Sequence, residues 1–147
     1  MNKKIFLPIL IYFFVFLQIF AESQGENLFK TNNPSQAVLF LEEEIENGTA
    51  SSVAYNYLGL AYYQLEEYEK SIKKKKKGLK VPATNKKILS FNQGNVYYAM
   101  KDYDKAIKKF SLTLTADPKY TKALLNRANA HLMKQNYQEA INDYEKF

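Results

Sequence analysis

The sequence contains 147 residues, 46% of them hydrophobic, and its formal net charge is +6. It has no cysteine and a single histidine, His131, which excludes disulfides, thiolate metal sites, a cysteine nucleophile and a multi-histidine metal centre. We therefore expect one modest domain or a short array of repeats, with no metal or cofactor.

The chain starts with Lys3 and Lys4 and continues with an apolar run over residues 5–20, which ends at Ala21 before a polar segment. This order is typical of a secretory signal peptide, and we predict that residues 1–21 are cleaved after Ala21. The run also reaches the lower length limit of a membrane-spanning helix, so an uncleaved anchor is the alternative. In both cases we expect export, with the bacterial periplasm or cell envelope as the location and secretion or membrane anchoring as alternatives.

The rest of the chain repeats itself. The segment at 91–107 is similar to the segments at 56–72 and 125–141, so that Gly94 lies 35 positions after Gly59 and 34 positions before Ala128. Each copy contains two stretches with apolar residues at helical spacing, separated by a short polar turn. This predicts units of paired helices at 52–86, 87–120 and 121–147, preceded by a degenerate partial copy at 22–51.

Small residues recur where the two helices of a unit are expected to approach each other. Gly59, Gly94 and Ala128 are predicted to face Ser71, Ala106 and Ala140 of their own copies. Because a pair of short helices cannot bury its apolar face alone, neighbouring pairs must stack on one another.

The repeat resembles the tetratricopeptide repeat (TPR) family. The family signature is met in order by these residues of the three full copies: Tyr55, Leu58, Gly59, Tyr62, Tyr68 and Ser71; Gly94, Tyr97, Tyr103, Ala106, Phe110 and Pro118; Leu124, Ala128, Tyr137, Ala140 and Tyr144. The resemblance implies an all-α solenoid of antiparallel helix pairs that form a right-handed superhelix, after the hydrophobic signal segment. Lys75 and Gly78 depart from it, because they replace an aromatic residue and an alanine.

The resemblance also implies where a partner binds. In such arrays the first helices of successive repeats line a concave groove that holds a segment of a partner, which predicts a non-catalytic scaffold for a protein or peptide of unknown identity. The positions of this sequence that fall on that face are Asn56, Leu60, Tyr63, Gln64, Phe91, Asn95, Tyr98, Lys122, Leu125, Asn129, Leu132 and Met133. Asparagine can pair with a partner's backbone amides, and tyrosine supplies apolar area at low entropic cost.

One TPR subtype binds a C-terminal carboxylate with a cationic clamp. Asn92 and Lys122 match its pattern, but Asn56, Leu60 and Asn126 stand where a lysine, an asparagine and an arginine are needed. Since most of the positive charge is missing, we exclude this subtype.

A second candidate surface is basic. The lysine-rich patch comprises Lys73, Lys74, Lys76, Lys77, Lys80, Lys86 and Lys87, whereas residues 22–69 hold nine acids and one base. The alternative function is therefore an envelope adaptor that binds anionic lipid, an anionic polymer or an acidic protein through this patch. We expect no nucleic-acid binding, because no aromatic residue is interleaved with the lysines. Membrane contact would involve the signal segment or this patch.

We expect Lys75, which lies in the same run of lysines, to lay its stem on the core and extend its amine to water.

The sequence offers little for catalysis. His131 occupies the position of Tyr62 and Tyr97 in the other copies, so it is predicted to be a packed core residue, and no enzymatic motif accompanies it. The last copy ends at Phe147 inside its second helix, from which we expect the natural chain to continue. The oligomeric state is not predicted.

Overall fold

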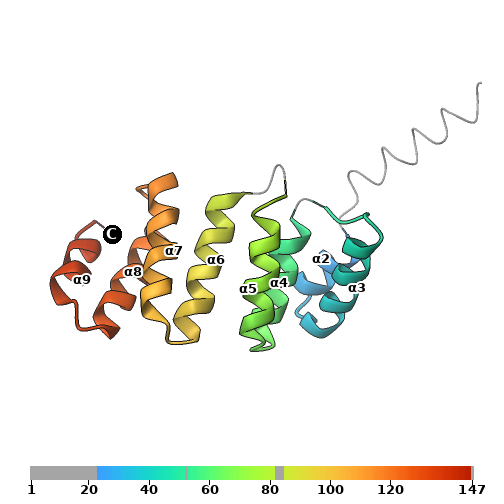
Figure 1. Ribbon diagram of the computed structural model, residues 1–147, viewed down its shortest axis with the longest axis horizontal. Coiled ribbons are helices and arrows are strands. Elements are labelled where there is room, and N and C mark those ends of the chain that lie inside the picture. Colours follow the sequence, from blue (N-terminus) through green and yellow to red (C-terminus); the bar gives the residue numbers. More distant parts are fainter. Residues whose placement is uncertain (1–22, 52, 82–84, 147) are drawn as a thin grey trace, which may run out of the picture.

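The computed structural model describes residues 23–51, 53–81 and 85–146, so the predicted signal segment at 1–21 lies outside the described residues. Within the described ranges the chain forms eight helices and no strand, which confirms the predicted all-α class. The helices stand side by side in one elongated row, from α2 and α3 at one end to α9 at the other (Figure 1). In these ranges no helix has the length and apolarity to cross a membrane.

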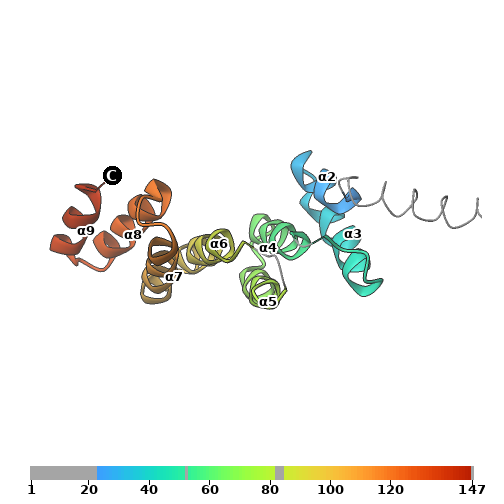
Figure 2. The same cartoon turned by 90° about the horizontal axis from the view of Figure 1, so that it is seen from above.

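The eight helices form four successive antiparallel pairs, and the row is seen from above in Figure 2. The pairs are α2 (Gln24–Lys30) with α3 (Pro34–Glu46), α4 (Ala54–Gln64) with α5 (Tyr68–Gly78), α6 (Lys86–Ala99) with α7 (Tyr103–Ala116), and α8 (Thr121–Met133) with α9 (Tyr137–Tyr144). The segment predicted as a partial copy, 22–51, thus holds two helices, of which α2 has only 7 residues.

The turn inside each pair has the same geometry. Its central residue is Asn32, Glu66, Lys101 or Gln135, and all four have φ between 59° and 64°. In each turn the next amide donates to a carbonyl five residues earlier: Asn33 N to Leu28 O, Glu67 N to Tyr62 O, Asp102 N to Tyr97 O and Asn136 N to His131 O, all at 2.9 Å. Three of the four turn residues are neither glycine nor asparagine, so the packing of the two helices holds them in this left-handed conformation.

The buried apolar residues gather in three clusters along the row. The first joins α3 and α4 through residues such as Leu41 and Leu58, the second joins α6 and α7 through Val96 and Phe110, and the third holds Leu114, Ala123 and Leu124. Helix α5 contributes one buried apolar side chain larger than alanine, Ile72, to the second cluster. The core is therefore thinnest between α5 and α6.

Close approach inside the pairs differs from the prediction in detail. A Cβ on Gly94 would lie 2.4 Å from Cε1 of Phe110, so the nearest neighbour of Gly94 is this ring and not Ala106. Gly59 does meet Ser71, whose hydroxyl donates to the Gly59 carbonyl at 2.5 Å, but a Cβ there would also lie 2.6 Å from Cγ of Lys75. In both pairs the space is filled by the residue four positions after the expected partner, Lys75 or Phe110. Side chains on a helix tilt toward its N-terminus, so a residue one turn later covers the position of the expected partner.

The prediction for Lys75 is wrong. Its side chain is fully buried, and its Nζ has no hydrogen-bond partner among the described residues. The amine lies 2.8 Å from the position that a Cβ on Gly59 would take, so it points into the α4–α5 pair and does not reach water. Glycine at position 59 leaves the room for it.

Candidate functional site

The concave-face residues predicted from the sequence lie on α4, α6 and α8, the first helices of three successive pairs. These helices contact one another directly, although a second helix follows each of them in the chain. Between them lies a cavity of about 290 Å³ lined by Tyr63, Asn95, Tyr98, Asn126 and Asn129. We call this cavity the amide pocket, because three of its five lining residues are asparagines.

Two pairs of asparagines connect the helices that form this face. Nδ2 of Asn126 donates to Oδ1 of Asn95 at 2.8 Å and joins α8 to α6, and Nδ2 of Asn92 donates to Oδ1 of Asn56 at 2.8 Å and joins α6 to α4. Each pair leaves one carbonyl oxygen and one NH₂ group without a partner in the described chain. A free donor and a free acceptor at fixed separation match the N–H and C=O of a peptide backbone.

Tyrosines form the walls of the amide pocket. The Tyr63 ring packs against Tyr68 with centroids 5.9 Å apart, and the Tyr98 ring packs against Tyr103 at 5.4 Å. Burial, and then the neighbouring Tyr103 and Tyr144, raises the pKa of Tyr98 above its ordinary value, which is already well above neutral pH. The second helices thus hold these rings in place and give the pocket rigid, uncharged walls.

The structure brings together four of the predicted groove residues, Tyr63, Asn95, Tyr98 and Asn129, and adds Asn126 to them. Sequence reasoning placed Asn126 only in the clamp comparison. Its partner Asn95 lies 31 positions earlier, whereas Asn92 and Asn56 lie 36 positions apart, so no common spacing identifies these pairs in the sequence. Asn56 lines a second cavity of about 200 Å³ with Val53, Asn85, Ile88 and Leu89.

The remaining predicted residues do not line the amide pocket. Phe91 packs on Phe110 and Tyr120 at centroid distances of 5.9 and 5.2 Å, which makes it a core contact. Leu60 and Leu125 are half-buried, whereas Gln64, Lys122, Leu132 and Met133 are exposed. Leu132 and Met133 lie in the last turn of α8, next to the end of the row.

The lysine-rich patch is not a single surface. Lys74 faces α3 and pairs with Glu42 at 2.5 Å, and Lys87 pairs with Asp117 at 2.8 Å. Although burial raises the pKa of Glu42, hydrogen bonds from Lys74 and Tyr62 outweigh it and lower the pKa. The other members, Lys73, Lys76, Lys77, Lys80 and Lys86, are exposed.

His131 is half-buried, so the prediction of a packed core residue holds only in part. It lines a cavity of about 260 Å³ between α8 and α9 with Arg127, Glu139, Asn142, Asp143 and Lys146. Burial lowers its pKa, with Asp143 acting in the opposite direction. In the described ranges no cluster of three histidine, cysteine or acidic residues could hold a metal ion.

Comparisons with known proteins agree with this architecture. Residues 91–146 match the family model described as tetratricopeptide repeat. No curated protein matches the sequence significantly.

Solved structures share the fold over most of the chain. The crystal structure of MamA superposes with a TM-score of 0.77 at 24% identity, covering 83% of this chain and 71% of that one. MamA from Desulfovibrio magneticus RS-1 gives 0.74 at 20% identity, covering 83% and 68%. The first TPR of Spaghetti (RPAP3), bound to the HSP90 peptide SRMEEVD, gives 0.60 at 26% identity, covering 65% and 75%. These likenesses confirm the predicted solenoid of TPR-type helix pairs.

Proposed function

We propose that this TPR-type solenoid is a non-catalytic scaffold that binds an extended segment of a partner protein on the face formed by α4, α6 and α8. The observation that carries the proposal is the pair of hydrogen-bonded asparagines, Asn95 and Asn126, in the amide pocket. Their mutual bond fixes both side chains before a partner arrives, so that binding costs little side-chain entropy.

The chemistry of the pocket favours the backbone of a segment over a terminal carboxylate. Its five lining residues carry no charge, and a carboxylate would lose its water without gaining a cation. The RPAP3 repeat was solved with an HSP90 peptide, which supports peptide binding as a use of this fold. In this chain, Asn56 and Asn126 replace a lysine and an arginine of the cationic clamp.

Selection of random peptides displayed on phage against the purified chain tests the proposal. We expect selected peptides to bind about tenfold more weakly to the variant that combines Asn95→Ala with Asn126→Ala, because a backbone hydrogen bond to each amide is lost. The matched control combines Gln138→Ala with Asn142→Ala, which removes an exposed amide pair on α9 with a bond of 3.1 Å. This control should bind as the parent does.

Two further probes distinguish the recognition mode. Amidation of the C-terminus of a selected peptide should leave its affinity unchanged, and the peptide SRMEEVD should bind at least tenfold more weakly than selected peptides. A requirement for a free carboxylate, or equal binding by the pocket variant and the parent, would contradict the proposal.

We further propose that the scaffold acts outside the cytoplasm. The support is the basic start followed by the apolar run at 5–20, as read from the sequence alone. N-terminal sequencing of the chain after expression in a bacterium with an envelope should show a mature start at Glu22. An unprocessed chain that stays in the membrane fraction would indicate the anchor instead.

A further inference from the structure

Another cavity, distinct from the one that Asn56 lines, lies between α5 and α6 on a different side from the amide pocket. It has a volume of about 260 Å³ and is lined by Glu69, Ile72, Lys73, Lys76, Tyr97 and Met100. We call it the α5–α6 cleft. Tyr97 lines the α5–α6 cleft and the adjacent Tyr98 lines the amide pocket, so the two cavities occupy faces of α6 about 100° apart.

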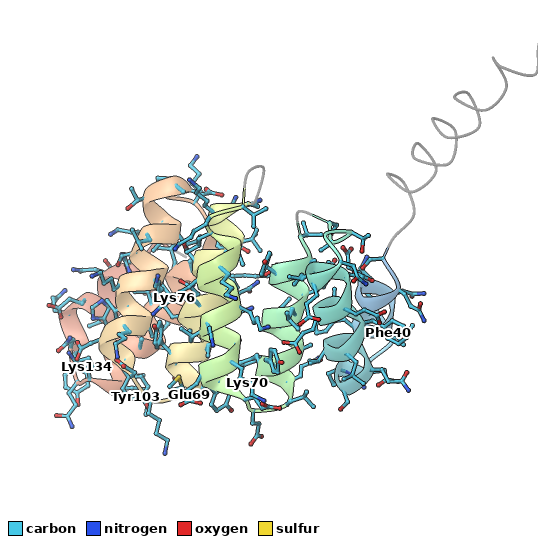
Figure 3. The ribbon with its side chains drawn as sticks, turned by 45° about the vertical axis from the view of Figure 1, so that its right-hand side comes forward. Phe40, Glu69, Lys70, Lys76, Tyr103 and Lys134 are labelled. Carbon is cyan, nitrogen blue, oxygen red and sulfur yellow. The ribbon has the colours of Figure 1, made fainter. Side chains whose placement is uncertain are left out.

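The rim of the α5–α6 cleft carries two lysines without an ion pair in the described part of the chain, Lys73 and Lys76, and one carboxylate, Glu69, so its net charge is positive. Lys70, Lys74 and Lys105 each pair with a carboxylate, but Lys73 and Lys76 form no ion pair within the described ranges. Figure 3 shows Lys76 at mid-height of the molecule, toward α7, with Glu69 below it. Burial, and then Lys76 and Lys108, lower the pKa of Lys109 on α7, so positive charge continues from α5 to α7.

The floor of the cleft is apolar and lies below this rim. Ile72 and Tyr97 are each only 8% exposed, and Met100 is half-buried. A bilayer-binding surface presents apolar side chains that protrude into the lipid. Here the lysine ammonium groups protrude and the apolar side chains lie recessed. The cleft can therefore receive an apolar group from a partner, but it has no protruding apolar side chain to insert into a bilayer.

We propose that the α5–α6 cleft binds an acidic segment of a partner protein, with one apolar side chain of the segment entering the cleft and flanking carboxylates pairing with Lys73 and Lys76. The charge of the rim selects an anionic partner, and the recessed floor selects one with a protruding apolar group. The Glu69 carboxylate on the rim repels a surface that is anionic throughout. A peptide segment can place its separate carboxylates next to the lysines and away from Glu69. This site is independent of the amide pocket.

The test uses three amidated decapeptides and the full chain. The first has a central leucine flanked by aspartates and glutamates. The second has serine in place of the leucine, and the third has asparagines and glutamines in place of the aspartates and glutamates. We expect the first to bind at 0.15 M salt, and the second and third to bind at least about tenfold more weakly.

Charge-matched variants locate the site. The double variant Lys73→Gln with Lys76→Gln should weaken the first peptide about tenfold, whereas Lys80→Gln with Lys86→Gln, which removes the same net charge away from the cleft, should change its affinity less than threefold. Met100→Glu should also weaken it, because it places a carboxylate in the cleft. The pocket variant Asn95→Ala with Asn126→Ala should bind this peptide as the parent does.

Three results would overturn the inference. An equal loss of affinity in the two lysine double variants would show that the peptide responds only to the overall positive charge of the chain. Equal binding of the leucine and serine peptides would show that the apolar floor takes no part. Binding to phosphatidylglycerol vesicles that needs Lys73 and Lys76, with none of the peptides bound, would assign the surface to anionic lipid.

Discussion

Lys75 is the residue at which this chain departs most from its own repeat. Leu41 lies 34 positions before it and Phe110 lies 35 positions after it, and both are fully buried apolar residues of the core clusters. Burial lowers the pKa of Lys75 from 10.5 to about 7, and in the part of the chain that the structure describes the amine has no hydrogen-bond partner to compensate its charge. Gln93, also fully buried, leaves both its Nε2 and its Oε1 without a hydrogen-bond partner among the described residues.

Replacing Lys75 by methionine should stabilise the protein by about 1–3 kcal/mol at pH 7, since a similar volume is kept and the desolvation of an amine is avoided. Urea unfolding followed by circular dichroism measures this difference. Lys77→Met on the exposed side of α5 is the control and should change stability by less than about 0.5 kcal/mol. A loss of stability in Lys75→Met would show that the amine has a compensating partner.

The buried amine of Lys75 also predicts that the stability of the protein depends on pH. Between pH 7 and 10.5 the unfolded chain binds the Lys75 proton and the folded chain releases it, so stability rises with pH through this window. Below pH 7 both states carry the proton, so folding bears the full cost of burying the charged amine. Above pH 10.5 neither state carries the proton and this cost disappears. From pH 6 to pH 9 the parent should therefore gain roughly 3 kcal/mol relative to Lys75→Met, because one proton is released over about two pH units. Parallel pH profiles of the two proteins would contradict this prediction.

At the scale of the helices, Arg127 ties three of them together. From α8 it donates to Asp143 of α9 through Nε at 2.7 Å and Nη2 at 2.6 Å, and through Nη1 to Oγ of Ser111 on α7 at 2.9 Å. The Asp143 side chain is only 4% exposed. A two-point contact with a buried carboxylate needs the planar guanidinium fork, which lysine lacks.

Arg127→Ala should lower the free energy of unfolding by about 3–5 kcal/mol, because it leaves the Asp143 carboxylate buried without a cation. Lys105→Ala, which removes the exposed pair with Asp102, should cost less than about 1 kcal/mol. Chemical denaturation of both variants measures the contrast. If the two substitutions cost the same, Asp143 is more accessible to water than its surroundings indicate.

The turns inside the pairs also belong to this scale. Glu66, Lys101 and Gln135 take the left-handed conformation that Asn32 adopts more readily. Their recurrence at 34 or 35 residues follows the repeat, so the position of each turn was predictable from the sequence. Its backbone conformation was not, because residues with side chains of this kind ordinarily avoid positive φ.

At the scale of the whole molecule, the three core clusters make stability uneven along the row. Helix α7 buries Ala106, Phe110, Thr113 and Leu114, whereas α5 buries Ile72 beside the unpartnered amine of Lys75. In arrays whose units contact only their neighbours, a weak interface lets one unit open without the rest. The α5–α6 interface is the weak one here.

Hydrogen exchange followed by mass spectrometry should therefore show faster exchange in α5 than in α7 at the same pH. Lys75→Met should slow exchange in α5 by about tenfold and leave α7 within about threefold of the parent, because the change stabilises the α4–α5 pair, whose main contact with the next pair is the weak α5–α6 interface. Uniform protection along the four pairs would show that the array opens as one unit.

The sequence by itself determined the repeat, the all-α class and the set of asparagines and tyrosines on the first helices. These follow from local spacing, since a period of 34 or 35 residues with small residues at Gly59, Gly94 and Ala128 places the same faces together in every copy. The sequence also located the two departures from the repeat, Lys75 and Gly78, both of which lie on α5.

Only the tertiary structure decided which residues meet across helices. It paired Asn95 with Asn126, moved Phe91 from the groove into the core, and divided the lysines among an ion pair with α3, the buried amine of Lys75 and the rim of the α5–α6 cleft. The physical reason is that helical spacing fixes a residue's direction on its own helix, whereas the neighbouring helices decide whether that direction leads to water, to a partner or into the core.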